Sequence, residues 1–252
     1  MNKAIGIDLS SRTTKIVQLK DGEIQHQEIF ETSHSPLKHV KTTLSRLGKA
    51  PIMATGYGRH LICENFDAQR VSEIKACGKG THHLFPGCRT VLDIGGQDYK
   101  LIQLSEKGSV LDFDMNDRCA AGTGKFLEIM AQAFNMDIEQ FVQTALNASG
   151  HINISSMCTV FAESEVVSLI TSGEPKEKIA LGLHLSIAQR LQAMFSKIPL
   201  VDDILFVGGR AKNDCLHAIL ERQLKRTIKR PEEPQIVVAL GAALLANDMT
   251  AA

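Results

Sequence analysis

Apolar residues in the first third of the chain fall into short runs and one amphipathic segment. Residues 4–9, 14–19 and 23–31 predict three strands, and the Asp-Gly pair at 21–22 indicates a hairpin turn between the last two. Residues 35–47 begin with Ser-Pro, carry leucine and valine at helical spacing and end before a glycine, so they predict a helix. A short strand at 51–55 and a helix at 72–84 follow. This alternation is typical of α/β proteins.

The same pattern then begins again. Residues 90–94, 100–104 and 110–115 predict three more strands, with a Lys-Gly turn at 107–108 before the last of them. The rest of the chain predicts strands at 152–155 and 204–207, and helices at 123–134, 137–148, 159–171, 175–197, 214–225 and 236–247.

A short repeat in the sequence accompanies this restart. DLSS at 8–11, followed by KIVQL at 15–19, resembles DIGG at 93–96 followed by KLIQL at 100–104, and one gap aligns them. Each block is a strand, a small polar turn with an aspartate, and a return strand. Two copies of one unit predict two lobes related by a pseudo-twofold axis, with a cleft between them. Two unrelated hairpins of similar composition are the alternative.

Composition narrows the classes of partner. The 252 residues include 28 Lys plus Arg and 28 Asp plus Glu, so no global basic field favours nucleic acid or an anionic membrane. With no Trp and only 2 Tyr, a stacking platform for single-stranded nucleic acid is disfavoured. The longest apolar runs are too short to span a membrane, and the N-terminus lacks the features of a signal peptide. We therefore expect a cytoplasmic protein.

The turns that follow three of the predicted strands carry the chemistry of a phosphate site. Asp8 ends the first strand and is placed to hold Mg²⁺, while residues 10–13 offer backbone N–H groups and hydroxyls. Asp93 repeats this position, and the glycines at 95–96 let the backbone approach phosphates closely. The glycine pair at 208–209 follows a strand and suits a base or ribose. Ordinary tight turns are the alternative, and no P-loop motif is present.

Two of the 6 cysteines stand out. Cys119 and Cys158 each lie in a loop of small residues directly before a predicted helix, where the helix N-terminus favours a thiolate. An iron–sulfur cluster needs four thiolates, which a twofold dimer of this chain would supply. Idle or buried free thiols are the alternative for both residues. The remaining four cysteines share no spacing and are interpreted as packing residues.

Together the three turns resemble the nucleotide-binding segments of the superfamily of actin, sugar kinases and heat-shock protein seventy. The resemblance implies an α/β protein with two ribonuclease-H-like lobes, an actin-like ATPase fold, closing on ATP and Mg²⁺. The first lobe would be residues 1–89 with a C-terminal helix at 236–252 returning to it, and the second 90–235. The residues implied to bind ATP or ADP are Asp8, Ser10, Ser11, Arg12, Thr13, Lys15, Asp93, Gly95, Gly96, Gln97, Gly208, Gly209, Arg210, Lys212 and Asn213.

Three longer strings narrow the resemblance further. DRCAAGTG at 117–124, CTVFAESE at 158–165 and DIGGQD at 93–98 resemble the signatures of the 2-hydroxyacyl-CoA dehydratase activators, the BadF/BadG/BcrA/BcrD ATPases. The resemblance implies a homodimer with one [4Fe–4S] cluster held by Cys119 and Cys158 of both chains. It also implies an ATPase that passes a low-potential electron from ferredoxin or flavodoxin to a dehydratase or a benzoyl-CoA reductase-like partner.

Other assignments stay open at this stage. Gln97, Asp98 and Glu163 are the candidates for orienting the hydrolytic water. A small-molecule kinase of the same fold is the rival enzyme, with Asp112 or Asp117 as its base, and an actin-like assembly protein is the rival without an enzymatic role. A basic run at 222–230 is interpreted as a solvated face, with an acidic electron donor as the alternative partner.

Overall fold

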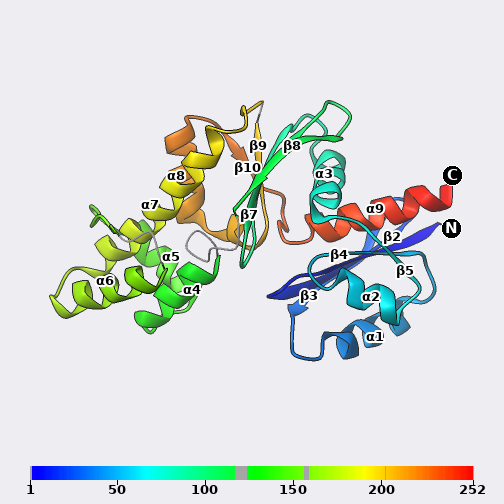
Figure 1. Ribbon diagram of the computed structural model, residues 1–252, viewed down its shortest axis with the longest axis horizontal. Coiled ribbons are helices and arrows are strands. Elements are labelled where there is room, and N and C mark those ends of the chain that lie inside the picture. The colour runs from blue at the N-terminus through cyan, green and yellow to red at the C-terminus, as the bar shows by residue number, and fades with distance from the viewer. Residues whose placement is uncertain (1, 117–123, 156–158, 202, 252) are drawn as a thin grey trace. The chain divides into compact units, whose positions relative to one another are not determined.

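The computed structural model describes residues 2–116, 124–155, 159–201 and 203–251. The chain divides into two compact units (Figure 1). The first unit comprises Met1–Val91, Ile102–Asp112 and Pro231–Ala252, and the second comprises Leu92–Leu101 and Phe113–Arg230.

The first sheet has five strands in the order β3-β2-β1-β4-β5. The central strand, β1, pairs antiparallel with β2 and parallel with β4. Its strands are β1 (Lys3–Leu9), β2 (Thr13–Lys20), β3 (Glu23–Glu31), β4 (Ile52–Thr55) and β5 (Ala68–Arg70). The helices of this unit are α1 (Pro36–Leu47), α2 (Arg59–Asn65), α3 (Glu73–Leu84) and α9 (Val237–Ala251).

Alternating side chains of the first sheet supply two cores. Ile16 packs with Val40 of α1 and Ile62 of α2 on one face of the sheet. The next residue, Val17, packs with Leu240 of α9 on the other face, as the period of two in a strand requires. Both faces of this sheet are therefore covered by helices.

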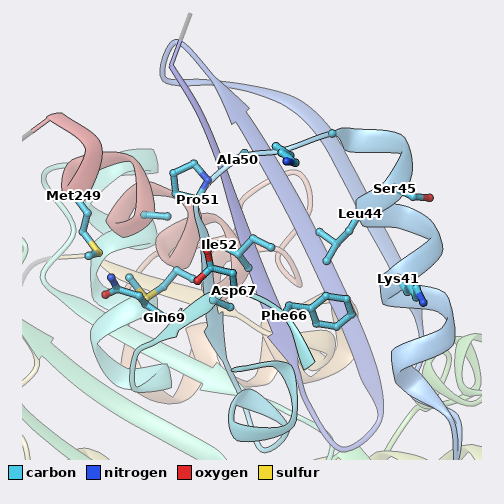
Figure 2. Close-up of a pocket in the computed structure, with 15 residues that line it drawn as sticks. Lys41, Leu44, Ser45, Ala50, Pro51, Ile52, Phe66, Asp67, Gln69 and Met249 are labelled. Atoms are coloured by element: carbon cyan, nitrogen blue, oxygen red, sulfur yellow. The ribbon is translucent and has the colours of Figure 1, made fainter. Parts of the chain in front are cut away.

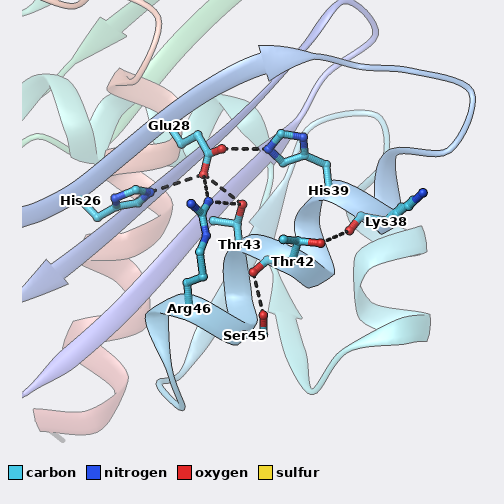
Figure 3. A network of polar contacts seen from close by, with 8 residues as sticks. All are labelled: His26, Glu28, Lys38, His39, Thr42, Thr43, Ser45 and Arg46. Atoms are coloured by element: carbon cyan, nitrogen blue, oxygen red, sulfur yellow. Dashed lines mark hydrogen bonds and ion pairs between the residues drawn. The ribbon is translucent and has the colours of Figure 1, made fainter.

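A polar network fastens α1 to β3 (Figure 3). Glu28 of β3 accepts hydrogen bonds from His39 (2.8 Å), Thr43 (2.9 Å) and Arg46 (3.1 Å) of α1. Burial alone would raise the pKa of the Glu28 carboxyl, but the hydrogen bonds from His39, Thr43 and His26 outweigh it and lower that pKa. The network adds polar contacts between α1 and β3 beside the stacking of the His39 ring on Phe30 of β3.

The second sheet repeats the topology of the first, in the order β10-β9-β6-β7-β8. Its strands are β6 (Thr90–Ile94), β7 (Tyr99–Leu104), β8 (Val110–Met115), β9 (Ile204–Val207) and β10 (Ile228–Lys229). Its helices are α4 (Gly124–Ala133), α5 (Ile138–Leu146), α6 (Thr159–Thr171), α7 (Lys176–Phe195), the 3₁₀ helix η2 (Gly209–Lys212) and α8 (Asp214–Leu224). The matching strand order confirms the predicted repeat of one α/β unit.

Some elements differ from the sequence prediction. The helix α2 and the short strands β5 and β10 were not predicted. The predicted strand at 152–155 is wrong, because this segment joins no sheet. Ile152 instead donates its N–H to the carbonyl of Lys178 (3.1 Å), and its own carbonyl lies against Gly182, where a Cβ would collide with it. The segment therefore packs along the start of α7 instead of joining a sheet. Among the described residues, no helix is long and apolar enough to cross a membrane.

Candidate nucleotide site

The end of β1 carries a buried ion pair inside a tight turn. Asp8 is 3% exposed, and its Oδ2 accepts from Lys15 Nζ (3.0 Å) while its Oδ1 accepts from Ser10 Oγ (2.7 Å). The N–H of Ser10 bonds to the carbonyl of Thr13 (3.3 Å) and closes the turn. The charge of Asp8 is thus balanced from within the hairpin, and Ser11 and Arg12 are left at its tip.

The end of β6 carries the equivalent pair. Asp93 is 6% exposed and lies 3.8 Å from the Nζ of Lys100, which also donates to Asp98 Oδ1 (2.9 Å). The N–H of Gly95 bonds to the carbonyl of Asp98 (2.9 Å), as Ser10 bonds to Thr13 in the first turn. The same interval separates Asp8 from Asp93 and Lys15 from Lys100, so the expected alignment gap is not needed.

The glycine turn after β9 packs directly on the Asp93 turn. Gly208 has a φ of +84°, which glycine adopts without strain, and a Cβ there would lie 2.5 Å from both Asp93 Oδ1 and the carbonyl oxygen of Ile94. The chain then forms η2 and reaches Asn213, which caps α8 by accepting the N–H of Leu216 (2.9 Å). The second unit therefore brings two of the three predicted nucleotide segments into contact.

A buried histidine forms a hydrogen bond with the side chain of Asn213. His184 is fully buried and lies 2.8 Å, through Nδ1, from the carbonyl oxygen of Ala180, so Nδ1 carries the proton. Its Nε2 accepts from the Asn213 amide (3.0 Å). Burial lowers the pKa of His184 to about 4, which keeps the ring neutral and preserves this acceptor.

A glycine that the sequence analysis missed occupies the corresponding place in the first unit. Gly56 follows β4 with a φ of +86°, and a Cβ there would lie 2.6 Å from Asp8 Oδ1 and would collide with the carbonyl oxygen of Leu9. Gly56 therefore stands to Asp8 as Gly208 stands to Asp93. The Gly-Tyr-Gly string directly after a strand was the available signal.

The structure also gives the surroundings of the other predicted site residues. Gln97 and Arg12 are exposed, and Glu163 is exposed on α6. Arg210 reaches Glu128 of α4, with 2.6 Å between Nη2 and Oε1. Cys119, Cys158 and Asp117 lie outside the described residues. The helices that follow the two cysteines, α4 and α6, pack against each other.

The other cysteines have packing environments. Within the described part of the chain, no disulfide joins Cys63, Cys77, Cys88 or Cys215, and all but Cys63 are buried. Burial raises the pKa of Cys215 to about 12, which makes it a poor thiolate ligand. The described residues contain no cluster of three or more His, Cys, Asp or Glu side chains suited to a metal.

A separate cavity opens in the first unit, away from the turns. Its volume is about 1070 Å³, and it lies between the end of α1, the start of β4, the strand β5 and the end of α9 (Figure 2). Leu44, Phe66 and Met249 line it together with Lys41 and Asp67. Among the described residues, none of those predicted to bind nucleotide contributes to its wall.

Comparison with known proteins decides the family. The model of the BadF/BadG/BcrA/BcrD ATPase family matches residues 5–246. The chain belongs to this family. The activator of lactoyl-CoA dehydratase from Anaerotignum propionicum is 41% identical, with 97% of each chain covered. The (R)-2-hydroxyglutaryl-CoA dehydratase activating ATPase from Acidaminococcus fermentans is 36% identical, with 96% of each chain covered.

The fold agrees with the family. The crystal structure of the Acidaminococcus fermentans (R)-2-hydroxyglutaryl-CoA dehydratase component A matches with a TM-score of 0.93 and 34% identity, covering 100% of both chains. This BadF/BadG/BcrA/BcrD family member therefore has the actin-like ATPase fold, as the turns and the repeat predicted. Both the family resemblance and the fold class are confirmed.

Proposed function

We propose that this protein is an ATP-dependent reductive activator. Mg·ATP binds between the Asp8 turn and the paired Asp93 and Gly208 turns, and the lobes 1–89 with 236–252 and 90–235 close on it. The protein hydrolyses ATP and delivers a low-potential electron to a 2-hydroxyacyl-CoA dehydratase or a benzoyl-CoA reductase-like partner. The observation that carries this proposal is the duplicated Asp–Lys turn, found in a chain whose relatives are named activators.

The two aspartates suit the metal that accompanies ATP. Oxygen ligands are what Mg²⁺ prefers, and it keeps several of its waters, so a carboxylate on each side of the nucleotide can hold it directly or through water. Lys15 and Lys100 neutralise these buried carboxylates when the metal is absent. The backbone N–H groups of the tip residues would bind the phosphates.

The hydrolytic water requires an orienting group. Asp98 already binds Lys100, and Glu163 lies on α6. Gln97 is exposed at the tip of the second turn, between the residues that would face the phosphates. We assign Gln97 the role of orienting the water, because its amide can accept one proton from the water and donate to a phosphate oxygen.

The thiolate set suits a cluster shared by two chains. Cys119 and Cys158 from each copy of a homodimer give the four ligands of a [4Fe–4S] cluster, which would supply a one-electron carrier. In the sequence Cys158 directly precedes α6 and Cys119 lies five residues before α4, and these two helices of the second unit pack together. The N-termini of these helices would stabilise the negative charge of the thiolates. Ferredoxin or flavodoxin is the electron donor.

The energetic demand on ATP is modest. Lowering a one-electron potential by about 200 mV requires about 4.6 kcal/mol. The nucleotide supplies this if it binds one lobe arrangement about 2 × 10³-fold more tightly than the other. Binding and hydrolysis of ATP together provide a difference of this size.

Anaerobic purification tests the proposal. We expect a brown protein with about four iron and four sulfide per dimer, and ATP hydrolysis that needs no sugar. Addition of a purified dehydratase component and a reductant should then give ATP-dependent dehydration. A colourless protein whose ATP turnover depends on a sugar would instead establish the kinase alternative.

A further inference from the structure

The first turn of α4 is fixed by the Asp93 turn. The N–H of Gly124 donates to the carbonyl of Gly95 (3.2 Å), and the N–H of Lys125 donates to the carbonyl of Gly96 (3.0 Å). The first N–H groups of a helix have no acceptor within the helix, so these bonds satisfy groups that would otherwise need water. The two glycines of the phosphate turn therefore set where α4 begins.

The same end of α4 is fixed by the Gly208 turn. Arg210 lies in η2, and its guanidinium forms an ion pair with Glu128 of α4, 2.6 Å from Nη2 to Oε1. Both side chains are largely buried, with 14% and 20% of their surface exposed. Gly124 lies one helical turn before Glu128, and a Cβ on it would collide with the Nε of Arg210. The guanidinium therefore rests on the bare backbone of Gly124.

We propose that the Arg210–Glu128 pair transmits occupancy of the nucleotide site to the start of α4. Arg210 and Glu128 are positioning residues in this role, which rests on the proposed nucleotide site. A nucleotide that shifts the Gly208 turn shifts η2 with it. The carboxylate of Glu128 follows the guanidinium, because separating two largely buried charges is costly.

The position of α4 in the sequence gives this link its consequence. The helix starts five residues after Cys119, so its first turn continues directly from the segment that carries this cysteine. Coupling between two sites is reciprocal, so a change at this segment alters nucleotide affinity by the same factor. One buried ion pair would thus connect the nucleotide site with the segment that carries Cys119.

The variants that test this link substitute residues of α4 and none of the nucleotide turns. Glu128→Gln keeps the shape of the side chain and removes its charge. Gly124→Ala places a Cβ where the Arg210 guanidinium lies and displaces it, and serves as the test if Glu128→Gln does not fold. Asp203→Asn is the matched control, because it breaks the ion pair with Lys229 (2.7 Å) in the same unit.

Hydrogen exchange of the full-length, anaerobically purified protein provides the readout, with and without Mg·ADP. In the wild type we expect the nucleotide to slow exchange both at 208–212 and at 124–130. In Glu128→Gln and Gly124→Ala the protection at 208–212 should persist, while the response at 124–130 falls at least about threefold. Asp203→Asn should behave as the wild type.

The possible outcomes distinguish failure of the proposed link from failure of the proposed nucleotide site. A response at 124–130 that is undiminished in both variants would show that the ion pair is only a brace, and would overturn the link. Protection of 208–212 without any response at 124–130 in the wild type would overturn it as well. Absence of protection at 208–212 in the wild type would reject the proposed nucleotide site itself.

Discussion

Each of the two turns contains one buried carboxylate. Asp8 and Asp93 are each almost fully buried against a lysine from the next strand. A buried carboxylate is costly unless it is paired, and removing one partner leaves the other charge uncompensated. We therefore expect substitution of either partner to lower stability strongly and, on the proposed function, to weaken Mg²⁺ binding.

Replacing Asp8 by Asn tests the first turn. Asparagine keeps the acceptor for Ser10 but loses the charge that balances Lys15 and that, on the proposed function, binds Mg²⁺. We expect the affinity for Mg·ATP, measured by calorimetry, to fall by about 10- to 100-fold, or about 1.4–2.7 kcal/mol. Asp21→Asn, at the exposed hairpin turn, is the control and should bind normally. Equal affinity in both variants would contradict the assignment.

His184 predicts a pH dependence of folding. Its pKa is lowered from 6.5 to about 4, so below pH 6.5 the unfolded chain binds a proton that the folded chain refuses. The contribution of the neutral ring is complete above pH 6.5 and is lost as the pH falls toward 4. Between pH 7 and pH 5 the loss is about 2 kcal/mol. Urea unfolding should show this extra loss in the wild type and not in His184→Gln, with exposed His151→Gln as the control.

Most residues of the turns could be predicted from the sequence, because an aspartate at the end of a strand followed by small residues is a local signal. The contacts of Gly56 and Glu128 could not be predicted, although the Gly-Tyr-Gly string indicates a turn at residue 56. The role of Gly56 depends on β4 lying beside β1, and that of Glu128 depends on an arginine far away in the sequence. Contacts of this kind exist only after the sheets have formed.

At the scale of elements, glycines set how closely helices approach. Gly241 of α9 faces Ala76 of α3, and a Cβ on it would collide with the carbonyl oxygen of Ala76. Gly80 faces α9 in the same way, with the carbonyl oxygen of Val237 occupying the place of its missing Cβ. The two helices therefore pack backbone against backbone, and neither can accept a methyl group without moving.

Replacing Gly241 by Ala tests this packing. The new methyl group would meet backbone rather than a flexible side chain, so α9 and α3 must separate. We expect a loss of about 1–3 kcal/mol in the free energy of unfolding, measured with urea. Gly87→Ala is the matched control, because nothing lies within 4 Å of its Cβ. Equal stability of the two variants would contradict close packing at this crossing.

The elements that the sequence predicted well have strong periodicity or clear ends. The helix α1 begins at Pro36 and ends before Gly48, whose φ is +77°. The strands β5 and β10 have only three and two residues, too few to show alternation. Residues 152–155 have the composition of a strand, but their partner is the start of α7. The composition of such a segment does not distinguish pairing with a strand from packing against a helix.

At the scale of the whole molecule, the cluster ligands are testable by iron content. Cys119→Ala or Cys158→Ala leaves two of the four thiolates of a dimer, which is too few to retain a [4Fe–4S] cluster. Alanine at Cys63, Cys77, Cys88 or Cys215 should leave iron per dimer unchanged, with some loss of stability from the cavity. Full iron in the first two variants would refute the ligand assignment.

Air exposure should destroy the proposed cluster and leave nucleotide binding intact. Oxidation of a ligand thiolate toward sulfinic acid loosens a cluster, while the nucleotide turns contain no cysteine. We expect the visible absorbance to bleach while calorimetry still detects Mg·ATP binding. Complete loss of nucleotide binding on bleaching would show that the fold and the cluster depend on each other.

The return of α9 to the first sheet has a consequence for synthesis on the ribosome. The helix is made after the whole of the second unit, yet its residues Ala239 and Ala243 press against Gly6 of β1. The second unit is complete once residue 230 has emerged, whereas the apolar face around Val17 waits for α9. The half that is translated first is thus the half that matures last. Until then its uncovered sheet is a surface that a nascent-chain chaperone would shield.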